Sequence, residues 1–177
     1  MSDDRSPRAR VAEQPVAFGR RLAGSDAFKA MFREGMALVE ETATYLDGEG
    51  RRQSHILSRS ASLAYATESM RLTTRLMQLA SWLLLQRAVN EGDLTADQAN
   101  HERSKVKLGG MSTATEGSSW DDLPERLRQL IGRSMRLQER VMRLDGALRG
   151  EPGAEIQENR VARDLDRLAD AFGAKVV

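Results

Sequence analysis

The stretch ESMRLTTRLMQLASWLLLQRAV, residues 68–89, decides the fold of this 177-residue chain. It lacks proline and glycine, and it belongs to a helical pattern that extends from about Ser58 to Asn90, with Gly92 as a stop signal. At about 100° per residue, its apolar side chains cover roughly half of the helix circumference. They are Leu72, Leu76, Met77, Leu79, Ala80, Leu83 and Leu84. One neighbour cannot bury so wide an arc, so the pattern predicts packing against two other helices.

Two further helices are predicted to supply those neighbours. The first covers about residues 25–47, with Ser25 as its N-cap and an apolar residue on each turn. The other covers about residues 122–149, where apolar residues from Leu123 to Leu148 alternate in steps of four and three, the spacing of a coiled-coil seam. The expected fold is all-α, an antiparallel three-helix bundle with a long central helix.

Polar connections separate these helices. GEGRRQSH, residues 48–55, is expected to be irregular, and the segment that follows Gly92 contains a candidate short helix at about residues 95–103. Thr95 and Gln98 have the spacing of a capping box at the start of that helix. The connection between the second and third long helices extends from Gly92 to about Asp122. A connection of this length within a small domain is often functional or disordered.

The bundle is assigned to residues 21–150, between two tails. Residues 1–20 hold two prolines among charged and small residues without sustained periodicity, so a flexible tail is predicted there. Residues 151–177 are predicted to form a second flexible tail that has room for one short helix. The chain ends with the apolar residues AKVV, which offers the alternative that an unfoldase binds this end directly.

Several classes of function are disfavoured by what the chain lacks. The absence of cysteine excludes disulfides, thiolate zinc sites and thiol catalysis. His55 and His101 lie in polar stretches without the spacing of a metal site, so both are expected at the surface. No catalytic residue, cofactor site or metal site is therefore predicted, and an enzyme is the weakest of the functional hypotheses.

Charge and hydropathy also restrict the partners. Lys and Arg total 27 against 26 Asp and Glu, so the net charge of +1 gives no general attraction to nucleic acid. The longest apolar run, WLLL, is far shorter than the roughly 20 residues of a membrane span, and the N-terminus lacks the apolar core of a secretory signal. We expect a cytoplasmic protein that binds neither nucleic acid nor membrane.

Apolar residues beyond the predicted core suggest a surface for a protein partner. Trp82 falls outside the main apolar arc, beside Arg71, Arg75 and Leu85, and is predicted to be exposed. The third helix carries a second apolar edge, formed by Ile131, Met135 and Met142. One interpretation is a homodimer that hides these edges across a two-fold axis. The alternative is that the short helix near residues 95–103 or the C-terminal segment folds over them.

Arginines follow one side of the third helix. They are Arg126, Arg133, Arg136, Arg140 and Arg143. Guanidinium groups in such a stripe can bind acidic protein, phosphate or a nucleotide. The alternative is a solvated flank whose arginines pair with glutamates on a neighbouring helix.

Two segments resemble a known family. FKAMFREGMALVEETATYLDGEGR followed by SLAYATESMRLTTRLMQLASWLLLQRAV is similar to the RcdA family of bacterial regulators of CtrA degradation. The resemblance spans about residues 17–92. It implies a non-enzymatic, often dimeric adaptor that helps the ClpXP protease select substrates, together with a CpdR response regulator and, in some settings, a cyclic-di-GMP-binding partner.

The residues and the resemblance together predict an adaptor that tethers protein cargo to a primed protease and so raises the effective concentration of the cargo. The resemblance supplies no residue-level binding motif, so the surface candidates come from the pattern alone. The alternative is a dimeric helical scaffold or signalling protein without a link to a protease.

Overall fold

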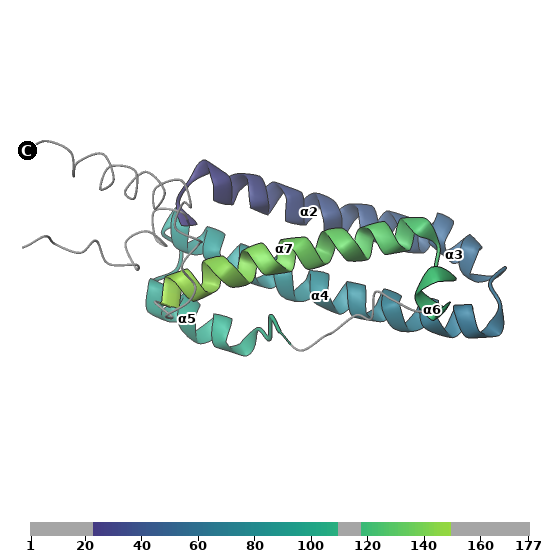
Figure 1. The fold of residues 1–177 in the computed structure, drawn as a ribbon. Coiled ribbons are helices and arrows are strands. Elements are labelled where there is room, and N and C mark those ends of the chain that lie inside the picture. The colour runs from purple at the N-terminus through teal and green to yellow at the C-terminus, as the bar shows by residue number, and fades with distance from the viewer. Residues whose placement is uncertain (1–22, 110–117, 150–177) are drawn as a thin grey trace, which may run out of the picture.

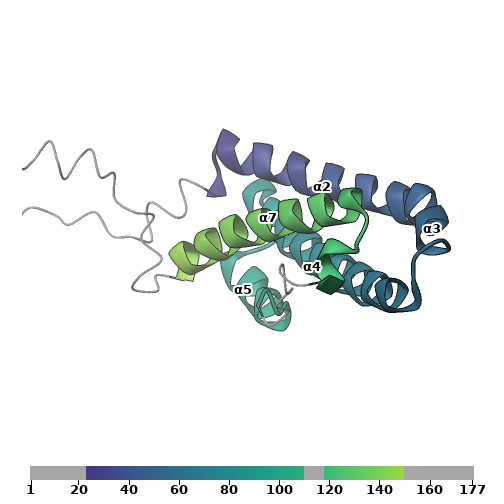
Figure 2. The same ribbon diagram turned by 45° about the vertical axis from the view of Figure 1, so that its right-hand side comes forward.

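The computed structural model describes residues 23–109 and 118–149, and these residues form helices without any strand. Three long helices, α2 (Asp26–Asp47), α4 (Arg59–Glu91) and α7 (Glu125–Arg149), pack side by side, as Figures 1 and 2 show. α4 is the longest and contacts both of the others. The predicted all-α fold with a long central helix is confirmed. The predicted tails lie outside the described residues.

The helix directions differ from the antiparallel arrangement that was predicted. α2 runs opposite to both α4 and α7, whereas α4 and α7 run in the same direction (Figure 1). Cross-helix contacts agree, because Arg75 pairs with Ser134 and Trp82 pairs with Asp145, with both numbers rising together. The chain between α4 and α7 is long enough to return along the bundle, and long crossover connections make parallel neighbours possible.

Local sequence explains where the helices start and stop. The Ser58 hydroxyl accepts a hydrogen bond of 3.3 Å from the Ala61 amide at the start of α4, and Gly92 ends the helix with φ of 83°. α5 (Ala96–Lys105) opens with the predicted capping box, in which Thr95 and Gln98 each accept a hydrogen bond from the other's backbone amide. A short helix, α6 (Ser118–Asp121), precedes α7.

The expected irregular connection at residues 48–55 is instead largely helical. α3 (Glu49–Ser54) packs on α2, where Gln53 Oε1 accepts a 2.8 Å hydrogen bond from the Tyr45 hydroxyl. An added Cβ at Gly50 would lie 2.5 Å from the Tyr65 hydroxyl, so the small residue allows α3 to approach both tyrosines. Contacts with distant residues stabilise a helix that the polar sequence did not predict.

The core follows one heptad-spaced stripe of α4, which we call the inner seam. Its members are all buried, and they are Ala61, Tyr65, Glu68, Leu72, Arg75, Leu79, Trp82 and Gln86. Leu83, also fully buried, lies where all three long helices meet. An added Cβ at Gly35 of α2 would lie 2.6 Å from Leu83 Cδ1 and 3.5 Å from Leu137 Cδ2 of α7. Gly35 therefore provides the notch in which Leu83 packs.

Candidate partner-binding surfaces

The surface predicted around Trp82 lies inside the protein. Trp82 is 0% exposed, and its indole Nε1 donates a 2.8 Å hydrogen bond to Asp145 Oδ1 on α7. From α5, the Arg103 guanidinium carbon lies 5.8 Å from the centre of the indole ring. The prediction that Trp82 is exposed is wrong, because α5 folds over this part of α4. The alternative, in which the short helix covers the apolar edge, is confirmed for this residue.

The other residues predicted beside Trp82 are engaged within the protomer or partly covered. Arg75 is 1% exposed and donates a 3.1 Å hydrogen bond to Ser134 Oγ. Burial lowers the pKa of Arg75, and the nearby Glu68 carboxylate opposes that shift. Arg71 forms an ion pair of 2.6 Å with Glu68, and Leu85 is half-buried. Arg75 thus connects α4 to α7 and is not available at the surface.

The second predicted edge, on α7, is exposed only at one end. Ile131 is 0% exposed, and Met135 is half-buried against the core. Met142 has 46% of its surface exposed. The prediction of a continuous apolar edge is therefore wrong for Ile131, because that side chain points into the interface between α7 and its neighbours.

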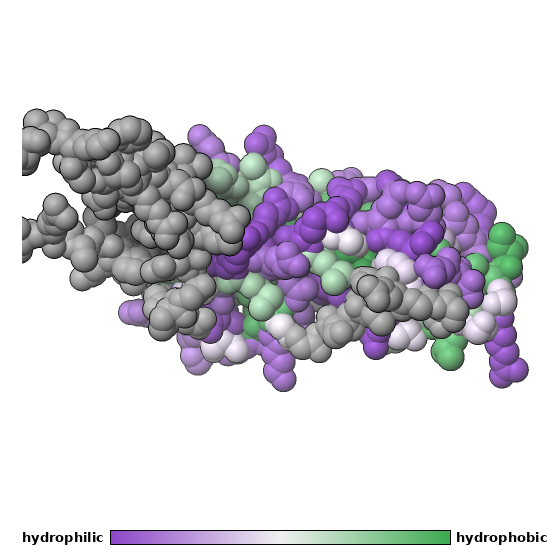
Figure 3. All heavy atoms as spheres, viewed as in Figure 1, coloured by the Kyte–Doolittle hydropathy of each residue, from purple (hydrophilic) through white to green (hydrophobic). Residues whose placement is uncertain are grey.

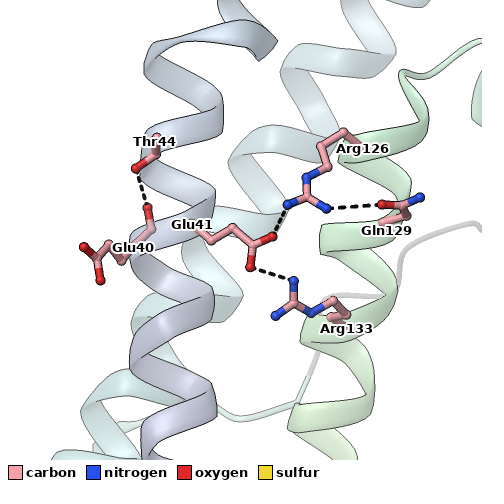
Figure 4. Close-up of polar contacts among 6 residues, drawn as sticks. All are labelled: Glu40, Glu41, Thr44, Arg126, Gln129 and Arg133. Carbon is pink, nitrogen blue, oxygen red and sulfur yellow. Dashed lines mark hydrogen bonds and ion pairs between the residues drawn. The ribbon is translucent and has the colours of Figure 1, made fainter.

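The arginines of α7 that face α2 are paired. Glu41 of α2 lies between Arg126 and Arg133 and accepts a hydrogen bond from each, the one from Arg133 at 2.6 Å (Figure 4). Two turns further along, Glu34 pairs with Arg140 at 2.6 Å. This part of the stripe matches the predicted alternative, in which arginines pair with glutamates on a neighbouring helix. Each of these three arginines thus has a glutamate partner on α2.

An apolar surface lies instead on the outward face of α4. We call it the outer stripe, and it consists of residues seven positions apart: Leu63, Met70, Met77 and Leu84. Their exposed fractions are 71%, 71%, 62% and 52%, and Ile56, a further seven positions earlier in the α3–α4 turn, is 85% exposed. Met77 and Leu84 were predicted to be core, and this prediction is wrong. A spacing of seven keeps side chains near one line on a helix, so they form a seam that no other described element covers.

The polar residues within the outer stripe do not make it hydrophilic. Thr67, Thr74 and Ser81 lie on the same face, and each hydroxyl donates to the carbonyl four residues earlier at 2.9 Å. Between Ser60 and Gln86 the charged residues are Glu68, Arg71 and Arg75, of which the first and last are buried. The outer stripe therefore presents neither a charge nor an uncommitted hydroxyl proton.

The opposite character is seen on the side of the molecule that displays α7. Figure 3 shows mostly hydrophilic side chains over this side, with hydrophobic groups gathered at the end of the bundle where α3 and α4 meet. An exposed row of large apolar side chains on an otherwise charged surface is the kind of patch that marks a protein interface.

The remaining polar groups of the described residues form no metal-binding arrangement. His55 and His101 are exposed, as predicted. Among residues 23–109 and 118–149, no three His, Cys, Asp or Glu side chains gather closely enough to hold a metal ion. None of the helices in this part of the chain has the length and apolar character that crossing a bilayer requires.

Comparison with known proteins identifies a family. A model described as a protein of unknown function, DUF1465, matches residues 19–172. Among solved structures, RcdA from Caulobacter crescentus CB15 is similar, with 52% sequence identity and a TM-score of 0.58. The match covers 70% of this chain and 92% of the Caulobacter chain. The chain belongs to the RcdA family. No curated protein matches the chain.

The membership of this chain in the RcdA family agrees with the resemblance in residues 17–92. The outer stripe was nevertheless missed by sequence reasoning. Its signal is present in the sequence as large apolar residues at positions 56, 63, 70, 77 and 84. Met77 and Leu84 were predicted to share one broad apolar arc with the core residues, because apolar residues also occupy the buried side of α4.

Proposed function

We propose that this RcdA-family chain is a non-enzymatic adaptor in regulated proteolysis that brings protein cargo to the ClpXP protease in the cytoplasm. The proposal is supported by the 52% identity to RcdA from Caulobacter crescentus and by the resemblance to regulators of CtrA degradation. In this role, cargo binds one surface while another surface engages the protease primed by a response regulator. Cleavage then accelerates through effective concentration, without new chemistry.

The observation that carries the proposal is the outer stripe. From Leu63 to Leu84 it extends along about 30 Å of helix, at 1.5 Å per residue. Such a seam is complementary to a second amphipathic helix, whose apolar residues pack between its methionines and leucines. Methionine side chains are flexible and polarizable, so they can pack closely against such a helix.

We further propose that two copies of the chain pair through the outer stripe. In an antiparallel pair about a two-fold axis, the segment of one copy that holds Met70 and Met77 lies beside the same segment of the other copy. The surface is uncharged, so like charges do not oppose this pairing. The earlier candidates for dimerisation, Trp82 and Ile131, are buried and give way to the outer stripe.

Dimerisation is tested by Met70→Lys together with Met77→Lys. Both side chains are exposed, so we expect the variant to fold with the circular dichroism of the wild type and to sediment as a monomer. Met142→Lys, an exposed methionine outside the outer stripe, is the matched control and should leave the dimer intact. A wild type that sediments as a monomer at all concentrations would refute the dimer.

The adaptor role is tested by reconstituted degradation. Candidate cargoes are incubated with ClpXP and the response regulator, and the protein is added or withheld. Acceleration that requires this protein supports the proposal. If the protein binds partners in a pull-down but no cargo is degraded faster, the second candidate, a dimeric helical scaffold without a protease link, is favoured by the same outer stripe.

A further inference from the structure

We propose that a cleft on the outer side of α6 and α7 binds an acidic peptide segment of a protein partner. The cleft has a volume of about 540 Å³. It is lined by Trp120 of α6 and by residues of α7, which are Glu125, Arg128, Gln129, Gly132, Arg133 and Arg136. Three guanidinium groups, one carboxylate and an indole ring therefore line the same cleft. The proposal concerns binding alone and stands independently of the adaptor role.

Arg128 and Arg136 of the cleft lack the pairing with glutamates of α2 that Arg126, Arg133 and Arg140 make. Arg136 is exposed and has no ion-pair partner among the described residues. Arg128 has a single distant partner, the Asp121 carboxylate at 4.0 Å. Arg133 uses one terminal nitrogen for Glu41. A guanidinium has five donors, so hydrogen-bonding capacity remains at each position for an incoming anion.

Gly132 lies between Arg128 and Arg136 on the floor of the cleft. An added Cβ there would meet only Arg136 Nη1 among the described atoms, at the ordinary contact distance of 3.5 Å. Packing within the protomer therefore does not require glycine, although glycine costs about 1 kcal/mol in a helix relative to alanine. Bare backbone at this position leaves room for a ligand to approach the helix.

The positions of the two cations favour a peptide over a single phosphate. The Arg128 side chain is directed toward Asp121 and the Arg136 side chain lies over Gly132, so both lean toward the start of α7 and stay apart. Eight residues of helix separate their Cα atoms by about 12 Å. Carboxylates four residues apart in an extended chain are about 13 Å apart, at 3.3 Å per residue, and match this spacing.

Trp120 supplies the apolar part of the recognition. Its ring is half-buried against the core and forms one wall of the cleft. A leucine or similar side chain between the two carboxylates of the peptide would pack on the ring, while its acidic residues bind the arginines. The carboxylate of Glu125 accepts a 3.0 Å hydrogen bond from Gln129. It places a negative charge at one end of the cleft, where it would repel an acidic residue of the peptide.

The experiment measures fluorescence anisotropy of a labelled peptide with glutamate at every fourth position, leucine between, and serine and glycine elsewhere. The wild type should bind it, and the same peptide with glutamine in place of glutamate should bind about tenfold more weakly. Arg128→Gln with Arg136→Gln should also lose about tenfold in affinity. The control is Arg87→Gln with Arg143→Gln, which changes the net charge equally, from +1 to −1, outside the cleft and should retain binding.

A second variant, Gly132→Leu, leaves every charge unchanged. It should fold at least as well as the wild type, because the position is open, and it should bind the glutamate peptide more weakly, because the leucine side chain obstructs the cleft. Equal affinity for both peptides, or equal affinity of the cleft and control variants, would overturn the proposal. So would binding of inorganic pyrophosphate that depends on Arg128 and Arg136 without binding of the peptide. The binding assay contains no protease, so its outcome is distinguishable from that of the degradation test.

Discussion

On α4, several polar residues lie on the buried side and large apolar residues lie on the exposed side, which is the reverse of their placement on an ordinary surface helix. The inner seam includes the charged residues Glu68 and Arg75 and the amide Gln86, all buried. The outer stripe has exposed leucine and methionine at every seventh position. Amphipathic helices usually place charge outside and apolar residues inside. α4 therefore shows that burial is decided by available partners as well as by residue type.

Two buried polar groups of the inner seam, on Arg75 and Trp82, illustrate this point, because each has a specific partner on α7. Arg75 donates to Ser134, and Trp82 donates to Asp145. Polar groups that are hydrogen-bonded can be buried at little net cost, whereas unpaired ones are expensive. The outer stripe has no such complement within the described residues. The difference teaches that, among the described residues, one face of α4 is packed against neighbouring helices and the other is left exposed.

The adjacent residues Leu83 and Leu84 give the sharpest test of this comparison. Leu83 is 0% exposed beside Gly35 and Leu137, whereas Leu84 is 52% exposed. Leu83→Asp should cost at least about 4 kcal/mol, since it places an unpaired charge in the core, and should yield an unfolded chain. Leu84→Asp should change the free energy of unfolding of the monomer by less than about 1 kcal/mol. Far-UV circular dichroism with urea unfolding distinguishes them, and comparable losses would contradict the assignment of the two faces.

The two tryptophans provide a second contrast, with a smaller expected effect. Trp82→Phe removes the hydrogen bond to Asp145 and replaces the indole beneath Arg103 with a smaller ring, so we expect a loss of about 2–3 kcal/mol. Trp120→Phe changes a half-buried ring without a recorded hydrogen bond among the described residues and should cost about 1 kcal/mol or less. Urea unfolding followed by circular dichroism measures both. A Trp82 variant as stable as the Trp120 variant would show that the buried network contributes nothing.

Helix boundaries were predictable because their causes are local. Ser58, Gly92 and the Thr95–Gln98 pair each act within a few residues, and the structure places helix ends at all three. The short helix α5 was located by its cap even though its sequence is strongly polar. Local hydrogen bonding and backbone conformation therefore sufficed to place these helix ends, whereas α3, which depends on contacts with Tyr45 and Tyr65, was missed.

The orientation of α4 was not predictable from its own sequence. Apolar residues of the outer stripe and polar residues of the inner seam cancel when hydrophobicity is averaged around the helix. The partner of Trp82, Asp145, lies 63 residues away, and the cover over its ring comes from α5. Contacts at such separations depend on the assembled bundle. This explains why the prediction of exposed Trp82 and Arg75 was wrong while the fold class was right.

The tyrosines test the end of the inner seam that packs against α3. Burial, reinforced by repulsion from Tyr65 and Glu49 and opposed by Arg126, raises the pKa of Tyr45 to about 12 from the ordinary value of 10.0. Burial also raises the pKa of Tyr65. The folded state holds these protons more tightly than the unfolded state, so stability is full below pH 10 and declines as the pH rises toward 12.

At pH 11 the Tyr45 contribution to this decline amounts to about 1 kcal/mol, since one pKa unit corresponds to 1.36 kcal/mol. Tyr45→Phe should lose the hydrogen bond to Gln53 at neutral pH but unfold with a weaker dependence on pH between 10 and 12. Urea midpoints measured across that range provide the comparison with the wild type. An unchanged slope would mean that the Tyr45 hydroxyl is not buried as described.

The smallest expected effect separates surface arginines from the buried arginine of the inner seam. Arg126 pairs with Glu41 while 44% of its side chain is exposed, whereas Arg75 is almost fully buried. Arg126→Gln should cost less than about 1 kcal/mol, and this cost should shrink at high salt, because exposed ion pairs are solvated and screened. Arg75→Gln should cost more and respond little to salt, since ions cannot approach the buried site. Urea unfolding at low and high ionic strength measures both variants, and a salt-independent loss of several kcal/mol for Arg126→Gln would place Glu41 and its arginines among the contacts that hold the bundle together.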